Sequence, residues 1–353
     1  MLTQGHDKPK ETAERQAFYD RIDKQHMTPL WSVLGSLVTP QPASACQPFG
    51  WKFDAIRDAM MEAGGLITAK EAERRVLILE NPGLRGQSRT TTSLYAGVQL
   101  VLPGEVAPAH RHTQSALRFV LEGEGAHTAV NGEKTIMRYG DFVITPQLAW
   151  HDHGNESEEP MFWLDGLDIP VISMLDASFA EGLGEDTQEI TRNTGQSYSE
   201  FGHALLPDNA EQSIVSPIFN YPYDKSRETL EAMKRGSDPD QCHGWKLRYS
   251  NPLNGSDAIP TMGTFIQLLP QGPTMPFRST SGTVFVCTQG KGKTKIADTT
   301  IEWGEKDIFI APSWASIIHE PEEESVLFSF NDKPIQEKLG LYREQRGNAN
   351  SST

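Results

Sequence analysis

The sequence predicts a mainly β protein made of two β barrels, preceded by N-terminal helices. Short runs of alternating apolar and polar residues lie at even spacing between residues 90 and 172, separated by Gly, Asn and Pro. Such runs are typical of barrels and sandwiches. A similar series returns between residues 258 and 335, and an internal repeat of this kind indicates a duplicated unit. The residues before 90 instead show the spacing of amphipathic helices.

Local patterns predict the elements in order. Helices are expected over 11–25 and over 53–63, the second ended by Gly64-Gly65. Thr68 and Glu71 have the spacing of a capping box, so a third short helix begins there. Pro-rich sequence between the first two helices predicts a connection. Five segments follow from these patterns: an N-terminal helical and linker region (1–89), the first barrel (90–172), an inter-barrel region (173–257), the second barrel (258–335) and a C-terminal tail (336–353).

Composition excludes several classes of function. The formal net charge is −15, which makes the chain a poor candidate for binding nucleic acid or anionic membranes. No apolar run approaches the roughly 20 residues of a membrane helix, and the N-terminus lacks the apolar core of a signal peptide. The three cysteines, Cys46, Cys242 and Cys287, are too few and too dispersed for a disulfide framework or a thiolate metal site. We therefore expect a cytoplasmic protein.

The triplet His110-Arg111-His112 lies at the centre of the predicted chemistry. Residues i and i+2 of a strand point to the same face, so His110 and His112 direct two imidazoles to one point. His151, on a later strand, can supply a third. Three neutral imidazoles suit a divalent transition metal such as iron, zinc or copper, and they leave coordination positions for a substrate.

The second copy of the repeat has lost this pair of histidines. Aligning 104–112 with 272–280 places Arg278 and Thr280 where the first copy has His110 and His112. We therefore predict that the second barrel is structural and holds no metal. His319 survives near its end, and a lone histidine of this kind is expected to be a packed or surface residue.

The spacing around the first-barrel histidines resembles the double signature of the cupin barrel. The signature residues are Gly104, His110, His112, Gly140, Pro146, His151 and Asn155. Many cupins place a glutamate ligand four or five residues after the histidine pair, where this chain has Ala116 and Leu117. A set of three neutral ligands leaves the charge of the metal uncompensated, which favours an anionic chelating substrate.

Longer runs resemble the gentisate 1,2-dioxygenase family. They are residues 71–75, 94–99, 103–119, 150–155 and 163–168, and the similarity covers about 28–340. The resemblance implies an iron(II) bicupin, generally a homotetramer, that uses O2 to open 2,5-dihydroxybenzoate between C1 and C2 and gives maleylpyruvate. Relatives that act on salicylate or 1-hydroxy-2-naphthoate remain an alternative. A non-catalytic bicupin that binds a metal or an aromatic acid is a third possibility.

Three residues are candidates for catalysis beside the metal. Arg118 is expected to pair with the substrate carboxylate or a developing oxyanion, since its planar fork suits that task; an exposed arginine is the alternative. His153 follows His151 by two residues, so it is a candidate acid or base, or else a structural support for the ligands. Asp165 is a polar residue in an otherwise apolar strand, which a pocket would explain.

The expected substrate contacts lie on neighbouring segments. They are Tyr95, Gly97, Gln99, Arg118, His153, Arg74 and Arg75. Gly97 would give room for a ring to approach, and Tyr95 resembles the gentisate subgroup. Arg74 and Arg75 would add positive charge for the carboxylate, although a salt-bridged helix end explains them almost as well.

Overall fold

The computed structural model describes residues 12–347, so the first eleven residues of the predicted N-terminal region and the last six of the predicted tail lie outside it. The chain divides into two compact units, residues 1–43 and 44–353. The described part of the first unit contains α1 (Ala13–Asp23), which confirms the first predicted helix, and α2 (Leu30–Leu37). α2 was not predicted. Pro29 is its N-cap, where no helical hydrogen bond from the proline nitrogen is required.

The second unit begins with two further helices. α3 (Phe53–Leu66) runs through Gly64-Gly65 instead of ending there, because its apolar face is anchored by the buried Phe53 and Met60. α4 (Ala69–Ala72) starts at the predicted capping box. The remaining helices of this unit are the 3-10 turn η1 (Pro82–Leu84), α5 (Ile169–Met174), α6 (Gln196–Phe201), α7 (Tyr223–Gly236) and α8 (Lys333–Lys338). Within the described residues, no helix is long and apolar enough to cross a membrane.

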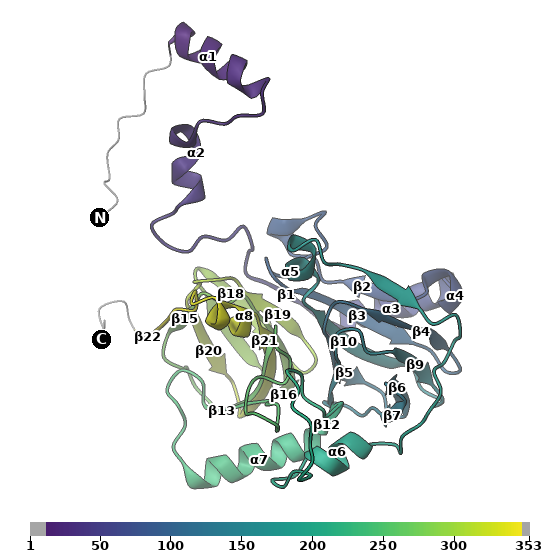
Figure 1. Ribbon diagram of the computed structural model, residues 1–353. Coiled ribbons are helices and arrows are strands. Elements are labelled where there is room, and N and C mark those ends of the chain that lie inside the picture. The colour runs from purple at the N-terminus through teal and green to yellow at the C-terminus, as the bar shows by residue number, and fades with distance from the viewer. Residues whose placement is uncertain (1–11, 348–353) are drawn as a thin grey trace. The chain divides into compact units, whose positions relative to one another are not determined.

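The first barrel consists of two antiparallel sheets with strand orders β12-β8-β5-β10-β3-β2 and β11-β4-β9-β6-β7. Their bounds are β2 (Val76–Ile78), β3 (Tyr95–Val101), β4 (Val106–His112), β5 (Ala116–Glu122), β6 (Ala126–Val130), β7 (Glu133–Ile136), β8 (Phe142–Thr145), β9 (His151–Asn155), β10 (Met161–Leu167), β11 (Ala180–Gly182) and β12 (Asn220–Tyr221). Figure 1 shows this barrel in blue to teal.

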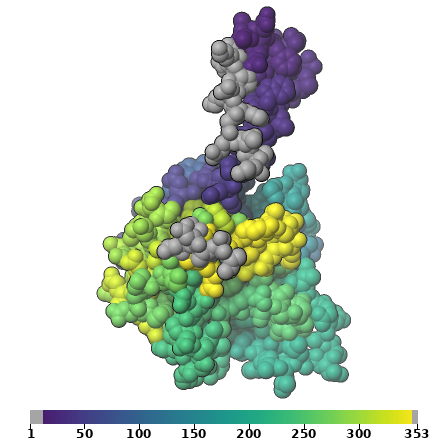
Figure 2. All heavy atoms as spheres, turned by 90° about the vertical axis from the view of Figure 1, so that its left-hand side faces the viewer, coloured from purple at the N-terminus to yellow at the C-terminus, as the bar shows by residue number. Residues whose placement is uncertain are grey.

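The second barrel repeats the arrangement, with strand orders β1-β19-β16-β21-β14-β13 and β18-β17-β20-β15-β22. Its strands are β1 (Phe49–Trp51), β13 (Trp245–Arg248), β14 (Gly263–Leu269), β15 (Phe277–Ser279), β16 (Thr283–Gln289), β17 (Gly292–Ile296), β18 (Thr299–Trp303), β19 (Ile308–Ala311), β20 (Ile317–Pro321), β21 (Ser325–Asn331) and β22 (Glu344–Arg346). It lies beside the first barrel, in green to yellow (Figure 1). Figure 2 shows the molecule with the second barrel facing the viewer.

Short strands from outside the predicted barrel segments complete the sheets. β2, β11 and β12 join the first barrel, and β1, β13 and β22 join the second. β1 comes from the N-terminal region and pairs with β19, more than 250 residues later, with Phe49 opposite Ile310. These are edge strands of two to four residues.

The cross-strand pairing shows that the gapless alignment of 104–112 with 272–280 is wrong by one residue at the ligand positions. The Gly104 N–H donates to Asn155 O, and the Gly272 N–H donates equivalently to Pro321 O, so the two loops begin alike. Phe277 then lies opposite Ile317, as His110 lies opposite His151. The connection after Gly272 is therefore one residue shorter than its counterpart, which an alignment without gaps cannot represent.

The positions of the metal ligands are consequently taken by Phe277, Ser279 and Ile317, and Arg278 corresponds to Arg111. Each of these arginines lies over a tryptophan ring, Arg278 at 4.6 Å from the centroid of Trp314 and Arg111 at 4.7 Å from that of Trp150. The conclusion that the second barrel lacks the histidine ligands is unchanged.

The two barrels share one hydrophobic core. Phe119 of β5 stacks on Phe328 of β21 with ring centroids 4.1 Å apart. A side chain at Gly166 of β10 would meet the ring of Phe330 at 2.8 Å, so glycine is required at this contact between the barrels. Packing at this density makes the two barrels one folding unit.

Truncating this core should destabilise the protein. We expect Phe328→Ala to lower the free energy of unfolding by about 3–5 kcal/mol, because it removes a fully buried ring and leaves a cavity. Phe179→Ala, at a half-exposed position, is the matched control and should change stability by less than about 1 kcal/mol. Chemical denaturation of both variants checks this, and equal effects would contradict a shared core.

A buried carboxylate also joins the barrels. Asp168, at the end of β10, accepts hydrogen bonds from the Ser115 N–H at 3.0 Å and from the Thr261 hydroxyl at 2.6 Å. Burial raises the pKa of Asp168 to about 6. The stability contributed by the protonated carboxyl is therefore fully present below the unfolded pKa of about 4. It is lost as the pH rises through the folded pKa of about 6.

Asp168→Asn should remove this pH dependence while keeping both hydrogen bonds, since the amide can accept from Ser115 and donate to Thr261. We expect the melting temperature of the variant, relative to wild type, to rise between pH 5 and pH 8. The gain corresponds to at most about 3 kcal/mol. Thermal unfolding across this range measures it, and a constant difference would contradict the raised pKa.

Candidate active site

Two neighbouring antiparallel strands bring the three predicted metal ligands together. β4 carries His110 and His112, and β9 begins at His151, which lies opposite His110. The ring centroids are 4.1 Å apart for His110 and His151, 4.9 Å for His112 and His151, and 5.3 Å for His110 and His112. One nitrogen from each ring lies within 4.8 Å of the others, so the three can bind one ion.

Backbone carbonyls fix the orientation of all three rings. Each Nδ1 lies within hydrogen-bond distance of a carbonyl oxygen two residues away in the chain. The pairs are His110 with Pro108 at 3.2 Å, His112 with Gln114 at 2.9 Å and His151 with Ala149 at 2.9 Å. A ring that donates its Nδ1–H to a carbonyl presents the lone pair of Nε2, which is the tautomer a metal requires, and this applies directly to His112 and His151. Nδ1 of His110 also faces an N–H of Arg74.

The surroundings keep these rings neutral and leave one lone pair unsatisfied. Burial, reinforced by the charge of Arg74, lowers the pKa of His110 to about 3, and burial lowers the pKa of His112 to about 4. Burial also holds the pKa of His151 well below its usual value. Its Nε2 is buried and has no hydrogen-bond partner among residues 12–347. Because buried polar atoms almost always have partners, this set of residues fits a divalent metal.

Arg118 provides a buried cation close to the cluster. It is 4% exposed, its Nη1 donates to Thr145 Oγ1 at 2.5 Å, and its Nε lies 3.5 Å from Asp165 Oδ1. Burial lowers the pKa of Arg118 to about 10, so it stays charged at neutral pH. Burial raises the pKa of Asp165 to about 6, against the opposing effect of Arg118. The alternative of an exposed arginine is therefore wrong.

His153 is fully enclosed behind the ligand cluster. Its ring centroid lies 5.7 Å from that of His151 and 5.5 Å from Trp163. Nδ1 lies 2.9 Å from the Thr128 hydroxyl, and Nε2 is buried without a partner in the described part of the chain. Burial holds the pKa of His153 well below its usual value. A neutral imidazole with one satisfied nitrogen can exchange a proton through the other.

The two adjacent arginines occupy different places. Arg74 reaches the cluster: its Nη2 donates to Pro108 O at 2.7 Å and contacts Nδ1 of His110. Arg75 does not, because its guanidinium forms two 2.8 Å bonds to the carboxylate of Glu105 and also donates to Ile67 O. The prediction of Arg75 as a substrate contact is therefore corrected: its donors are used within the scaffold.

The remaining predicted contacts lie on β3. Gln99 is 2% exposed and lies opposite Trp163, and Gly97 lies opposite Asp165. A side chain at Gly97 would meet Val76 Cγ1 at 2.6 Å and Tyr95 Oη at 2.9 Å. Protein atoms thus occupy the space above Gly97. The glycine makes room for the Tyr95 phenol and does not admit a substrate ring directly.

Sequence reasoning missed three polar neighbours of the site. Thr145 and Thr128 hold Arg118 and His153, and the Trp163 Nε1–H donates to Asp165 at 3.0 Å. Trp163 could have been found, since it shares a strand face with Asp165. The two threonines are ordinary strand residues, and only the cross-strand register reveals their partners.

Comparison with known proteins identifies the family. The cupin domain family matches residues 97–167. Gentisate 1,2 dioxygenase 1 of Aquipseudomonas alcaligenes is 56% identical over 342 residues, which cover 96% of this chain and 99% of that protein. The chain belongs to the gentisate 1,2-dioxygenase family.

Two further family members extend the comparison. The 1-hydroxy-2-naphthoate 1,2-dioxygenase of Nocardioides sp. (strain KP7) is 34% identical, covering 95% of this chain and 88% of that protein. The salicylate 1,2-dioxygenase of Pseudoaminobacter salicylatoxidans, in a structure of its adducts with gentisate, superimposes with a TM-score of 0.91 at 34% identity. That match covers 96% of this chain and 95% of that chain. The bicupin fold predicted from the repeat is thereby confirmed.

Metal binding should require the first barrel alone. We expect one equivalent of divalent metal per chain, lost on His151→Ala because two imidazoles hold an ion much more weakly than three. His319→Ala, at the second-barrel position corresponding to His153, is the control and should retain the full equivalent. Metal analysis after dialysis distinguishes the two variants, and loss of metal from the control would contradict the assignment.

Proposed function

We propose that this protein is an iron(II)-dependent gentisate 1,2-dioxygenase that cleaves 2,5-dihydroxybenzoate between C1 and C2 with O2 and forms maleylpyruvate. The observation that carries the proposal is the cluster of three neutral imidazoles beside the buried Arg118. It occurs in a chain 56% identical to a gentisate 1,2-dioxygenase over nearly its whole length. Membership of this family supports the ring-cleaving reaction.

His110, His112 and His151 would hold the metal. When bound there, iron(II) would supply a chelation point for an anionic aromatic substrate and a route for electron transfer to O2. Imidazole also suits zinc, copper and nickel, so the choice of iron follows from the oxygen chemistry of the reaction.

Arg118 would bind and orient the substrate carboxylate. Its Nε is buried, has no hydrogen-bond partner among the described residues and lies 3.5 Å from Asp165 Oδ1, and the bond from Nη1 to Thr145 holds the guanidinium in one orientation. A buried cation with an available donor is suited to bind a carboxylate or to stabilise negative charge that develops on an oxygen. Asp165 would act through Arg118 as a positioning residue.

His153 would exchange a proton with a ring hydroxyl through Nε2. Gln99, Tyr95 and Arg74 would complete the polar lining, with Gln99 and Tyr95 on the same face of β3. Burial, followed by the charge of Asp165, raises the pKa of Tyr95, so the phenol stays protonated as a donor. A protonated phenol on this wall supports a substrate with a second ring hydroxyl, as gentisate has.

We also propose a cytoplasmic homotetramer with no nucleic-acid or membrane partner. The resemblance to the family supports the tetramer. Cys46, Cys242 and Cys287 are all free and buried, which suits a reducing compartment.

Oxygen uptake by anaerobically iron-loaded protein tests the proposed reaction. We expect one O2 consumed per gentisate, with formation of the ring-opened keto acid, and slower turnover of salicylate and 1-hydroxy-2-naphthoate. Faster turnover of either alternative would reassign the substrate within the family. Binding of gentisate without oxygen uptake would leave only a non-catalytic binding protein.

Replacing Arg118 tests its role. We expect Arg118→Met to lower kcat/KM for gentisate by about 10–100-fold, the value of one buried charge-assisted hydrogen bond, and Arg118→Lys to restore part of it. Arg138→Met, at an exposed arginine paired with Glu124, is the control and should leave kcat/KM unchanged. Steady-state kinetics decide, and an unaffected Arg118→Met would remove this residue from the site.

A further inference from the structure

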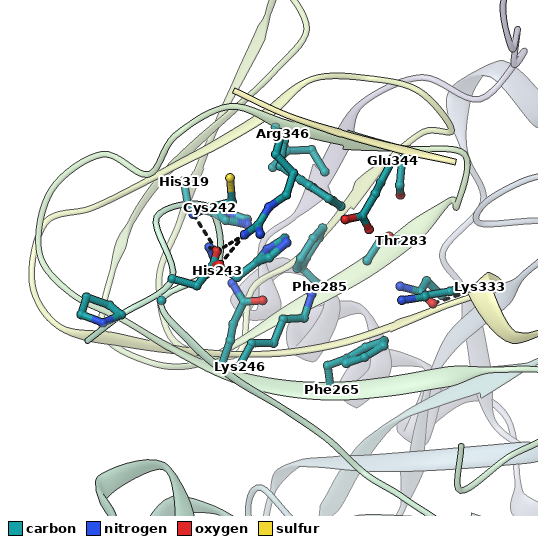
Figure 3. A pocket seen from close by; sticks show the side chains of 18 of the residues that line it. Cys242, His243, Lys246, Phe265, Thr283, Phe285, His319, Lys333, Glu344 and Arg346 are labelled. Atoms are coloured by element: carbon teal, nitrogen blue, oxygen red, sulfur yellow. Dashed lines mark hydrogen bonds and ion pairs between the residues drawn. The ribbon is translucent and has the colours of Figure 1, made fainter. Parts of the chain in front are cut away.

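The second barrel contains a cavity of about 560 Å³ where the first barrel has its metal ligands. Phe277, Ser279 and Ile317, which occupy the ligand positions, all line it. Figure 3 shows this cavity, with side chains from several strands directed into it. Its volume lies in the range typical of small-molecule sites.

The duplicated fold has kept polar residues in this cavity although the metal ligands are gone. His319 is the third residue of β20, as His153 is of β9, and its Nδ1 lies 2.9 Å from the Thr294 hydroxyl. Gln267 is the fifth residue of β14, as Gln99 is of β3. Two polar residues proposed to bind the substrate in the first barrel, His153 and Gln99, therefore have counterparts in the second barrel.

Gln267 lacks hydrogen-bond partners within the protein. It is 0% exposed, it lines the cavity, and neither Oε1 nor Nε2 has a partner among the described residues. Leaving a buried amide unsatisfied is costly, and such groups in native proteins usually bind a ligand or water. A ligand atom in the cavity could satisfy Nε2.

Lys246 places a cation next to this amide. It lies opposite Gln267 in the pairing of β13 with β14, so the two side chains share a face of the sheet. Its Nζ lies 4.7 Å from the centroid of the Phe265 ring and forms no hydrogen bond or ion pair within residues 12–347. Burial, then the charge of Lys333, lowers the pKa of Lys246 to about 8, which leaves it protonated at pH 7.

Two of the carboxylates that line the cavity have partners within the protein. Asp240 is bound by the guanidinium of Arg346, and Glu344 accepts a hydrogen bond from the Tyr342 hydroxyl at 2.6 Å. Asp238 is exposed at the rim. Among the other cations, Lys333 pairs with Glu337 at 3.5 Å. Lys246 is thus the cation of this cavity that a ligand carboxylate would neutralise.

Aromatic side chains form the remaining walls. Phe265, Phe277 and Phe285 all line the cavity, and Figure 3 shows Phe265 and Phe285 close to Lys246. Flat rings of this kind favour a planar apolar ligand by stacking and edge contacts. Because Lys333 and Arg346 are paired with Glu337 and Asp240, Lys246 suits one negative charge, whereas a phosphate dianion would bring a second charge without a cation of its own.

We propose that the cavity of the second barrel binds a small aromatic monocarboxylate without a metal, with the carboxylate on Lys246 and Gln267 and the ring against Phe265 and Phe285. This site is separate from the metal centre of the first barrel. It does not depend on the reaction proposed above.

Benzoate is a suitable probe, because it lacks the adjacent hydroxyl needed to chelate a metal. Calorimetry would use the full chain carrying Arg118→Met, which weakens the first-barrel site. We expect one benzoate bound per chain. Adding Lys246→Met should weaken binding at least tenfold, while adding Lys295→Met, an exposed lysine on the same barrel, should leave it unchanged. Equal binding by all three proteins, or none by the Arg118→Met protein, would overturn the proposal.

Two further measurements keep the test decisive. Gln267→Leu preserves the size of the side chain and should also weaken benzoate binding, so a folding defect in the Lys246 variant would not obscure the result. Acetate should bind at least tenfold more weakly than benzoate, since it cannot use the aromatic walls. Acetate binding as tightly as benzoate, or displacement of benzoate by equimolar inorganic phosphate, would contradict an aromatic monocarboxylate site.

Discussion

The first barrel depends on one constraint: three neutral imidazoles from two neighbouring strands meet at one point, and the buried Nε2 of His151 has no hydrogen-bond partner among the described residues. Burial prevents the rings from charging, so protonation cannot supply that partner at neutral pH. A metal ion placed between the rings would accept a lone pair from each of them at once. The antiparallel register of β4 and β9 creates this demand by setting His110 opposite His151, and Arg118 and His153 are arranged around the same point.

The two barrels place different side chains at equivalent positions of one scaffold. The first keeps His110, His112 and His151, and the second has Phe277, Ser279 and Ile317 in their places. The scaffold itself is preserved down to the hydrogen bond between a strand threonine and the remaining histidine, which is 2.9 Å long in both barrels. Without the histidine ligands, the second barrel has a cavity lined by aromatic and charged side chains.

Much of this could be predicted from the sequence, because strand alternation and the spacing of histidines are local properties. The pair His110 and His112, the contribution of His151 and the duplication all followed from such patterns. The role of Arg75 did not, because its partner Glu105 lies 30 residues away and nothing local distinguishes it from Arg74. The alignment of Arg278 with His110 failed for a related reason: a one-residue difference in a loop becomes visible only through cross-strand pairing.

The location of bound metal tests the central claim most directly. Crystals of the iron-loaded protein, measured on both sides of the iron absorption edge, should show one anomalous peak per chain, in contact with Nε2 of His110, His112 and His151. No peak should lie in the second-barrel cavity. Iron at any other position, or side chains of these histidines that diverge from it, would contradict the account.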